Sequence, residues 1–322
     1  MTLKEVAKLA GVSPSAVSRY LNGGPLSQAK SASIRRVIER TGYFPNQAAH
    51  TLRTGRVKQV GVIVPRIHSE AVSKVTAGIA EALDQEGYLP VLGISGRESR
   101  REARYLDMMR AYHVAGVILM ATSEELADLY RTSPVPLVVT GQRLPGLPCV
   151  FHDDFHAMTE LAARLLDRGR RRLCYIGVSQ ADPAVGRERL RGAREALRSA
   201  GLDPDAMPVE TAGFDWETGY RCMHRLLNAH PETDGVLCAT DTIAQGAMLA
   251  LRQAGRRIPE EVSVAGVGDD WADLVSLPCL TTARLYQREC GREAAEMLLR
   301  LMAGGEPEQR MLEYTIVDRG SI

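Results

Sequence analysis

The stretch TLKEVAKLAGVSPSAVSRYLN, residues 2–22, decides the fold of the N-terminal part of this chain. It predicts two short helices, the first over roughly Leu3–Ala10, separated by a turn at Gly11. A helix-turn-helix needs a small residue where the helices cross, a glycine in the tight turn and an apolar residue that faces the core. Ala7, Gly11 and Val17 hold these three positions, so the stretch predicts that motif.

The second predicted helix begins after Ser13, which is a good N-cap, and Pro14 suits its first turn. In a DNA-binding motif of this kind, the start of the second helix enters the major groove. The residues that we expect on the exposed, groove-facing side are Ser15, Ala16, Ser18 and Arg19. The alternative is an ordinary helical pair that shares the spacing and does not bind DNA.

The charge of the chain is distributed unevenly. Residues 1–57 contain nine Lys and Arg and two Glu, a net charge of +7, whereas the whole chain carries +1, so residues 58–322 carry −6. A basic head on an acidic body is expected where one part of a protein meets phosphates. The charge pattern therefore favours double-stranded DNA as a partner.

Composition argues against several other classes of protein. Hydrophobic residues make up 45% of the chain and charged residues 25%, as in ordinary globular proteins. No apolar run approaches the ~20 residues of a membrane-spanning helix, and the polar N-terminus predicts no secretory signal, hence a cytoplasmic location and no membrane partner. The six cysteines are widely spaced without a CxxC pair or a Cys/His cluster, so we expect free thiols, no metal site and no cofactor.

The sequence divides into three parts. A third helix, with Ser27 as its N-cap, completes a small all-α helix-turn-helix head over residues 1–45. Residues 46–57 form a predicted linker that is too short and too polar for an independent helix. In residues 58–322, β-branched strands alternate with amphipathic helices, which predicts doubly wound α/β domains with parallel sheets.

The large domain is predicted to have two lobes. Strands are expected near Val60–Val64, Leu89–Ile94, Gly116–Met120, Leu137–Val139, Cys149–Phe151, Leu173–Ile176, Gly235–Cys238 and Val262–Gly266. Helices are expected near Ser73–Gln85, Arg100–Tyr112, Ala157–Arg168, Arg187–Ala200, Trp216–Ala229, Thr242–Gln253 and Gly291–Met302. Because these strands are too many for one comfortable sheet, we expect two sheets of about five or six strands, with a ligand in the cleft between them.

With these features the chain resembles the lactose-repressor/galactose-repressor family of bacterial transcription regulators, whose sensor resembles periplasmic binding proteins. The resemblance rests on VAKLAGVSPSAVSRYLN (6–22), Tyr43-Phe44-Pro45-Asn46, VGVIVP (60–65), HDDFHAM (152–158), CATDTIAQGAMLAL (238–251) and IPEEVSVAGVGDD (258–270). It implies a homodimeric repressor that binds a near-palindromic operator and is controlled by a sugar or sugar phosphate. The chain ends directly after its last predicted strand, without a leucine heptad, so a dimer is expected rather than a tetramer.

The resemblance also implies which residues contact DNA. Arg19 is the candidate for a bidentate contact with guanine. The linker, residues 46–57, is expected to fold into a hinge helix only on specific DNA, and its Leu52 is expected to wedge into a central base step from the minor groove. Packing at a domain junction is the alternative for Leu52. The complete set of expected DNA contacts is Thr2, Ser13, Pro14, Ser15, Ala16, Ser18, Arg19, Asn22, Tyr43, Asn46, Ala49, Leu52 and Arg53.

Residues near strand ends are the candidates for the effector site. The candidates are Arg66, Asp153, Arg189, Trp216, Thr240 and Asp269. The resemblance implies that Arg189 grips sugar hydroxyls and that Trp216 lies against the sugar ring, while helix capping, turns, packing and surface or inter-lobe ion pairs are the alternatives for individual members of this set. Arg66 and Arg189 together would form an anion site.

Segments around Arg66 and Arg189 are similar to the trehalose-sensing members of the family. That similarity makes trehalose 6-phosphate, or a similar phosphorylated disaccharide, the leading expectation for the effector, with neutral sugars as the alternative. A sugar-binding protein of the transport type, without DNA binding, is the rival function. An enzyme is not expected, since no GxGxxG follows a strand and no GxSxG elbow occurs.

Overall fold

The computed structural model of the chain describes residues 1–21, 24–43 and 57–322, and it separates into a head unit, Met1–Val57, and a large unit, Lys58–Ile322. None of the helices in these described ranges combines the length and apolar character that crossing a membrane requires.

The head contains the predicted helix-turn-helix. Its helices are α1 (Leu3–Ala10), α2 (Pro14–Leu21) and α3 (Gln28–Thr41). Gly11 ends α1 with φ +68°, a left-handed conformation in which a side chain would be strained. Ala7 and Val17 are buried, as the motif requires, in the core of the head.

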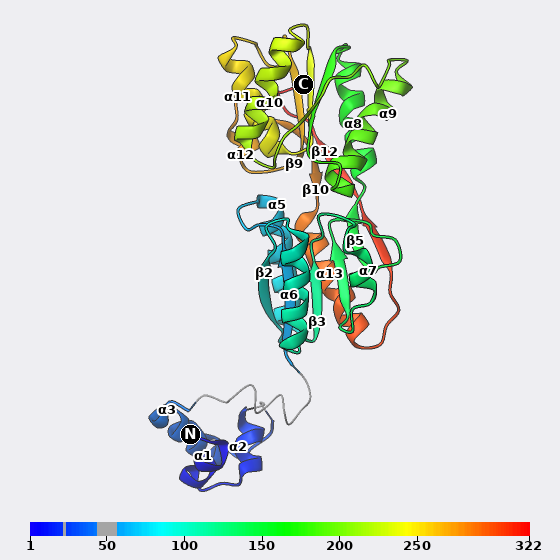
Figure 1. Cartoon of the computed structure of the whole chain (residues 1–322). Coiled ribbons are helices and arrows are strands. Elements are labelled where there is room, and N and C mark those ends of the chain that lie inside the picture. The colour runs from blue at the N-terminus through cyan, green and yellow to red at the C-terminus, as the bar shows by residue number, and fades with distance from the viewer. Residues whose placement is uncertain (22–23, 44–56) are drawn as a thin grey trace. The chain divides into compact units, whose positions relative to one another are not determined.

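The large unit consists of two lobes, each built on a six-stranded sheet (Figure 1). The first lobe has strand order β11-β5-β4-β3-β1-β2, and all its neighbouring strands are parallel. Its strands are β1 (Gln59–Val64), β2 (Leu89–Ile94), β3 (Gly116–Leu119), β4 (Leu137–Thr140), β5 (Cys149–His152) and β11 (Gln309–Leu312). Its helices are α5 (Glu70–Gln85), α6 (Ser99–Ala111), α7 (Ala127–Arg131) and α13 (Gln287–Met302).

The second lobe has strand order β12-β10-β9-β8-β6-β7, parallel except for the antiparallel pair β10–β12. Its strands are β6 (Leu173–Gly177), β7 (Val209–Thr211), β8 (Gly235–Cys238), β9 (Ser263–Gly268), β10 (Thr281–Leu285) and β12 (Tyr314–Val317). Its helices are α8 (Asp154–Asp167), the π-helix η1 (Pro183–Glu188), α9 (Arg189–Ser199), α10 (Trp216–Ala229), α11 (Asp241–Gln253) and α12 (Ala272–Val275).

The chain passes between the lobes three times, from β5 to α8, from β10 to α13 and from β11 to β12. The two-lobed α/β architecture was predicted correctly, but the sequence prediction missed β7, β10 and β11 as well as the short helices α7 and α12, and it gave no bounds for the last strand, β12. The missed strands have no more than five residues, and β7 and β11 lie at sheet edges where polar side chains interrupt the apolar pattern. The helix expected from Arg187 is preceded by η1, which is continuous with α9.

In the first lobe, helices α5 and α13 pack with their backbones almost in contact. A Cβ placed on Gly291 would lie 2.0 Å from the carbonyl oxygen of Val75, and one on Gly78 would lie 2.0 Å from that of Arg288. Only glycine allows two helices to approach this closely. The pair fixes α13, whose N-terminus borders the passage from β10 between the lobes.

We predict that Gly291→Ala destabilises the protein by about 1–3 kcal/mol, since the added methyl group forces two helix backbones apart. At an unconstrained helix position the same change stabilises a protein, because alanine has the higher helix propensity. Chemical denaturation of both proteins measures the difference, and an increase in the free energy of unfolding would contradict the packing described here.

Candidate functional sites

The exposed start of α2 presents the candidate DNA-reading side chains. The Ser13 hydroxyl accepts a hydrogen bond from the Ala16 amide at 3.3 Å, as an N-cap does, and lies 2.8 Å from the Ser15 hydroxyl. Pro14, Ser15 and Arg19 are exposed. The guanidinium of Arg19 is therefore on the surface of the helix that the motif directs toward DNA.

Two expected DNA contacts are placed differently from the prediction. Ala16 was expected on the exposed side of α2, but it is buried, because helical spacing places it beside Val17 on the inward face. Tyr43 was expected to contact phosphate, but its ring packs into the core of the head. These two side chains contribute mainly to the stability of the head.

The remaining DNA candidates divide into two groups. Thr2 caps α1 in a capping box with Glu5, in which the Thr2 amide donates to the Glu5 carboxylate at 2.7 Å, and Ser18 is half-buried. The candidates that lie outside the described residues are Asn22, Asn46, Ala49, Leu52 and Arg53.

In the large unit, a cavity lies between the lobes at the carboxyl ends of the strands of both sheets. The space free of protein atoms is about 910 Å³, part of it open to solvent, which is within the range of small-molecule sites. Its polar wall is formed by Arg66, Arg97, Gln142, His152, Asp154, Asp182, Arg189, Thr240 and Asp270. Three of the six predicted effector residues, Arg66, Arg189 and Thr240, line this cavity.

Arg189 is buried in the cavity wall and its charge is balanced by Asp154. The guanidinium lies 2.6–2.7 Å from the Asp154 carboxylate and also donates to the carbonyl oxygen of Ala239. Asp154 is the first residue of α8, just after the passage from β5. The pair therefore presents a fixed guanidinium–carboxylate surface of the kind that accepts and donates hydrogen bonds to vicinal hydroxyls.

Asp153, the predicted cavity residue, faces away from the cavity. Its carboxylate caps α8, accepting from the His156 amide at 3.1 Å, and pairs with the His156 ring at 2.7 Å. Its neighbour Asp154 lines the cavity instead. The side chains of two adjacent residues at a strand end point in different directions. An error of one position in the sequence therefore places the side chain on the opposite side of the backbone.

The opposite wall contains a cation–π cluster that joins the lobes. Arg66 follows β1 and Arg97 follows β2, and their guanidinium carbons lie 4.3 and 4.1 Å from the ring centre of Phe214, which follows β7. Arg97 also pairs with Asp182 of the second lobe at 3.0 Å. Burial, and then repulsion from Arg97, lower the pKa of Arg66 to about 10.

The aromatic position was predicted two residues too late. Trp216 begins α10 and is 47% exposed, outside the cavity, whereas Phe214 lines it. Both lie between β7 and the body of α10, and β7 was not recognised in the sequence. Without the strand end, the sequence did not show which of the two rings faces the cleft.

Asp269 is likewise replaced in the cavity by its neighbour. Asp269 has φ +60° and its carboxylate is bound by Arg284 at 2.6 Å and by Arg319. Burial favours a higher pKa for Asp269, but these two arginines outweigh it and lower that pKa. Asp270 lines the cavity instead, and burial together with Glu70 raises its pKa to about 6 despite the nearby Lys74.

Thr240 caps α11, accepting from the Ile243 amide at 3.3 Å, and also lines the cavity, so both interpretations of this residue hold. Three buried polar atoms of the cavity wall have no hydrogen-bond partner within the described ranges: Arg66 Nε, Gln142 Oε1 and His152 Nε2. Buried polar atoms are nearly always satisfied. A ligand rich in hydroxyl groups would supply the missing partners.

Comparisons with known proteins agree with both parts of the chain. A family model described as "Bacterial regulatory proteins, lacI family" matches residues 2–46, and one described as "Periplasmic binding protein-like domain" matches residues 162–322. The chain is 34% identical to the HTH-type transcriptional regulator CelR of Thermobifida fusca, over 99% of this chain and 98% of that protein.

Two solved structures extend the comparison. A transcriptional regulator CelR–cellobiose complex has 30% identity and a TM-score of 0.77, covering 100% of this chain and 99% of that one. The lac repressor dimer bound to operator and the anti-inducer ONPF has a TM-score of 0.91 at 22% identity, covering 100% of this chain and 98% of that one, a likeness in fold. The helix-turn-helix, the two-lobed sensor and a relative that matches along nearly the whole chain show that this protein belongs to the lacI family of bacterial regulatory proteins, which are DNA-binding transcriptional regulators and not enzymes.

Proposed function

We propose that this protein is a repressor that binds a near-palindromic operator as a homodimer in the cytoplasm and is controlled by a sugar bound between its lobes. The observation that carries the proposal is the cavity with three unpartnered buried polar atoms, in the same chain as a helix-turn-helix with an exposed arginine. The relatives support it, since one is described as a complex with cellobiose and another, from Staphylococcus xylosus, as a sucrose operon repressor.

The DNA contact that specifies sequence is assigned to Arg19. An exposed guanidinium on a recognition helix makes bidentate hydrogen bonds to guanine, while the other basic residues of the head supply contacts with phosphates. Leu52 is proposed to wedge between central base pairs from the minor groove. The charge of +7 over residues 1–57 provides the general attraction to DNA.

The effector is proposed to be a disaccharide that carries an anionic group, with trehalose 6-phosphate as the leading candidate. Among the described residues, no carboxylate lies within ion-pair distance of Arg66, whereas Arg97 and Arg189 are paired with Asp182 and Asp154. A half-buried cation without an ion-pair partner favours an anionic ligand. A neutral disaccharide is the second candidate, favoured by the relative that is described with cellobiose.

The homodimer is proposed to form through an apolar surface that both lobes contribute. Trp271, Leu274, Val275 and Leu277 are 61–76% exposed around α12, and the edge strand β2 exposes further apolar side chains. In Figure 1, α12 and β2 lie on the same side of the large unit. Clusters of exposed apolar side chains of this kind mark interfaces, and a second copy is the partner that the family resemblance implies.

Control of DNA binding is proposed to act by population shift. Salt bridges and hydrogen bonds join the lobes on both sides of the cavity, including Arg97–Asp182 at 3.0 Å, Arg187–Glu124 at 2.7 Å and Lys74 to the Asp269 carbonyl at 3.0 Å. A ligand that binds one arrangement of the lobes more tightly shifts the protein toward that arrangement. The coupling free energy required is typically about 1–3 kcal/mol.

Arg19→Ala is expected to abolish discrimination between the operator and unrelated DNA, because it removes the base contact and leaves the phosphate contacts. Fluorescence anisotropy with both duplexes at several salt concentrations measures it. Arg36→Ala, which removes an exposed cation of α3, is the matched control and should weaken binding to both duplexes equally. Retained discrimination in Arg19→Ala would exclude the proposed role.

Arg66→Gln is expected to weaken trehalose 6-phosphate far more than trehalose or cellobiose, because only the phosphorylated sugar needs the cation. Calorimetric titration of the three sugars measures the effect, with Arg110→Gln, an exposed arginine of α6, as the control. Equal losses for phosphorylated and neutral sugars would remove the anionic effector and leave the neutral disaccharide.

Leu277→Asp is expected to convert the dimer to a monomer and to weaken operator binding, since a charge at a buried apolar contact is unfavourable. Met311→Asp is the matched control, because Met311 is 56% exposed on β11, the opposite edge of the first sheet from β2. Light scattering after size-exclusion chromatography gives the molar mass. A monomeric wild-type protein, or a dimeric Leu277→Asp protein, would refute the proposed interface.

A further inference from the structure

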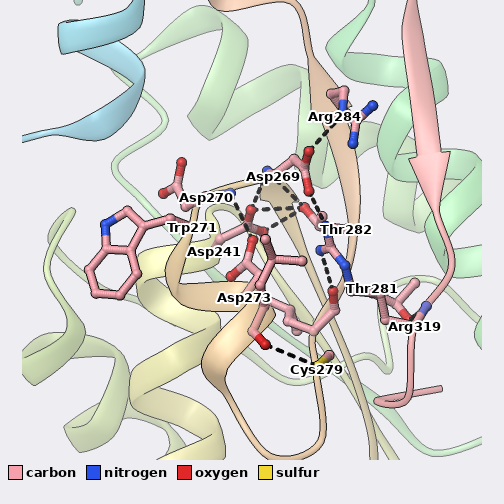
Figure 2. Close-up of polar contacts among 12 residues, drawn as sticks. Asp241, Asp269, Asp270, Trp271, Asp273, Cys279, Thr281, Thr282, Arg284 and Arg319 are labelled. Carbon is pink, nitrogen blue, oxygen red and sulfur yellow. Dashed lines mark hydrogen bonds and ion pairs between the residues drawn. The ribbon is translucent and has the colours of Figure 1, made fainter.

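Two fully buried carboxyl groups face each other beneath the turn that leads from the cavity to the apolar surface. Asp241 is the first residue of α11 and Asp273 lies in α12, with exposed fractions of 1% and 0%. Their carboxyl groups hydrogen-bond to each other. Figure 2 shows both beside Thr282, with the Asp269–Trp271 turn next to them.

The donors that reach this carboxyl pair are neutral. The Thr282 hydroxyl lies 2.7 Å from Asp241 Oδ1, and the Asp269 amide lies 2.5 Å from Asp241 Oδ2. Asp273 accepts from the Gln245 side-chain amide at 2.9 Å and from the Asp270 backbone amide at 2.8 Å. No lysine or arginine of the described ranges forms a salt bridge with either carboxyl group, and the nearest positive influence on Asp273 comes from Arg319, whose guanidinium is bound to Asp269.

The backbone is shaped to accommodate the pair. A Cβ on Gly266 would lie 2.3 Å from Asp241 Oδ1, and one on Gly268 would lie 2.8 Å from Asp241 Oδ2. Glycine at these two positions of β9 leaves the space that the Asp241 carboxyl group occupies. The position of the Asp241 carboxyl group therefore depends on the glycines of β9 as well as on the side-chain rotamer of Asp241.

Charged side chains on the neighbouring elements form ion pairs with residues other than Asp241 and Asp273. Asp269 is bound by Arg284 of β10 and Arg319 of the C-terminal segment, and Lys74 of α5 pairs with Glu70 at 2.8 Å and with Asp270 at 3.7 Å. These ion pairs occupy the cations closest to the turn. Two carboxylates in contact in a buried site cannot both be ionised at moderate cost.

We propose that Asp241 and Asp273 share a single proton and that this proton fixes the Gly268–Asp273 turn. The turn contributes Asp270 to the cavity wall, contacts α5 of the other lobe through Glu70 and Lys74, and leads into the apolar surface around α12. Loss of the proton at alkaline pH places two negative charges in contact and loosens the turn. Any effect of this proton on sugar binding rests on the proposed function, but the existence of the shared proton is independent of that function.

The sign of the pH dependence follows from linkage. Burial, followed by the facing Asp273, raises the pKa of Asp241 well above its ordinary value, and burial also raises that of Asp273. Above about pH 4 the unfolded chain has released this proton while the folded protein keeps it. The contribution of this proton to the stability of the wild type therefore falls as pH rises. The folding constant decreases by about tenfold per pH unit until the folded pair ionises.

Asp241→Asn tests the shared proton directly, because the amide keeps a donor toward Asp273 without needing a proton. The folding constant of this variant relative to the wild type should rise by up to about tenfold per pH unit above about pH 5, until the folded pair of the wild type ionises. Asp273→Asn is the matched comparison and should destabilise at every pH, since its one amide oxygen cannot accept from Asp241, Gln245 and Asp270 together. Parallel pH curves for the wild type and Asp241→Asn would overturn the proposal.

Two spectroscopic measurements on proteins that keep the Asp241–Asp273 pair test the proposal even if one of the Asn variants folds poorly. The infrared spectrum of the wild type should contain the C=O band of a protonated carboxyl group at pH values where ordinary aspartate and glutamate side chains are ionised, and the difference spectrum against Asp241→Asn should show its loss. The chain has two tryptophans, so in a Trp216→Phe variant Trp271 is the only one left. The fluorescence anisotropy of Trp271 should fall as the Asp241–Asp273 pair ionises. Absence of the protonated band, or a Trp271 signal independent of pH until global unfolding, would refute the shared proton or its hold on the turn.

Discussion

Charge compensation in the cleft between the lobes is the constraint on which the rest of the large unit depends. A buried guanidinium requires a carboxylate, and Arg189 of α9 finds one in Asp154, at the point where the chain enters the second lobe. The same rule applies at Arg97 and Asp182, which lie on different lobes. Because these partners come from separate elements, the ion pairs fix the relative positions of strand ends, and the cavity takes its shape from them.

The arrangement links three surfaces that regulation would need. Asp270 lies in the cavity wall, and the backbone amide of its neighbour Trp271 donates to the Glu70 carboxylate of the other lobe at 3.3 Å. The apolar side chains of α12 follow directly in the sequence. A change at the cavity therefore has a short covalent path to both the lobe interface and the proposed dimer surface. Packed elements with two discrete arrangements transmit such changes better than flexible ones do.

Sequence reasoning predicted the local elements of this protein well and the orientation of single side chains less well. The head follows from local rules: Gly11 has the expected left-handed backbone and Val17 the expected burial. The parallel sheets follow from apolar strands alternating with helices. The short edge strands could not be recognised, because strands of three or four residues with exposed polar positions resemble loops.

Two of the three errors at the site share one physical origin, whereas the choice of Trp216 over Phe214 follows from the unrecognised strand β7. Asp153 and Asp269 were predicted to line the cavity, and in each case the following residue does so. Side chains alternate in direction where a strand ends, and the turn at Asp269 adds a left-handed residue, φ +60°. Composition identifies which residue types gather at a strand end, but the direction of each depends on backbone angles that a single sequence does not specify.

The central claim is that one chain couples DNA recognition by its head to ligand binding between its lobes. The most direct measurement is the affinity of the full-length protein for a duplex of its own promoter region, titrated against salt with and without cellobiose and trehalose 6-phosphate. The account predicts binding that weakens steeply with salt and an affinity that one of these sugars changes several-fold. Weak binding that shows no preference for the promoter and no response to either sugar would contradict it.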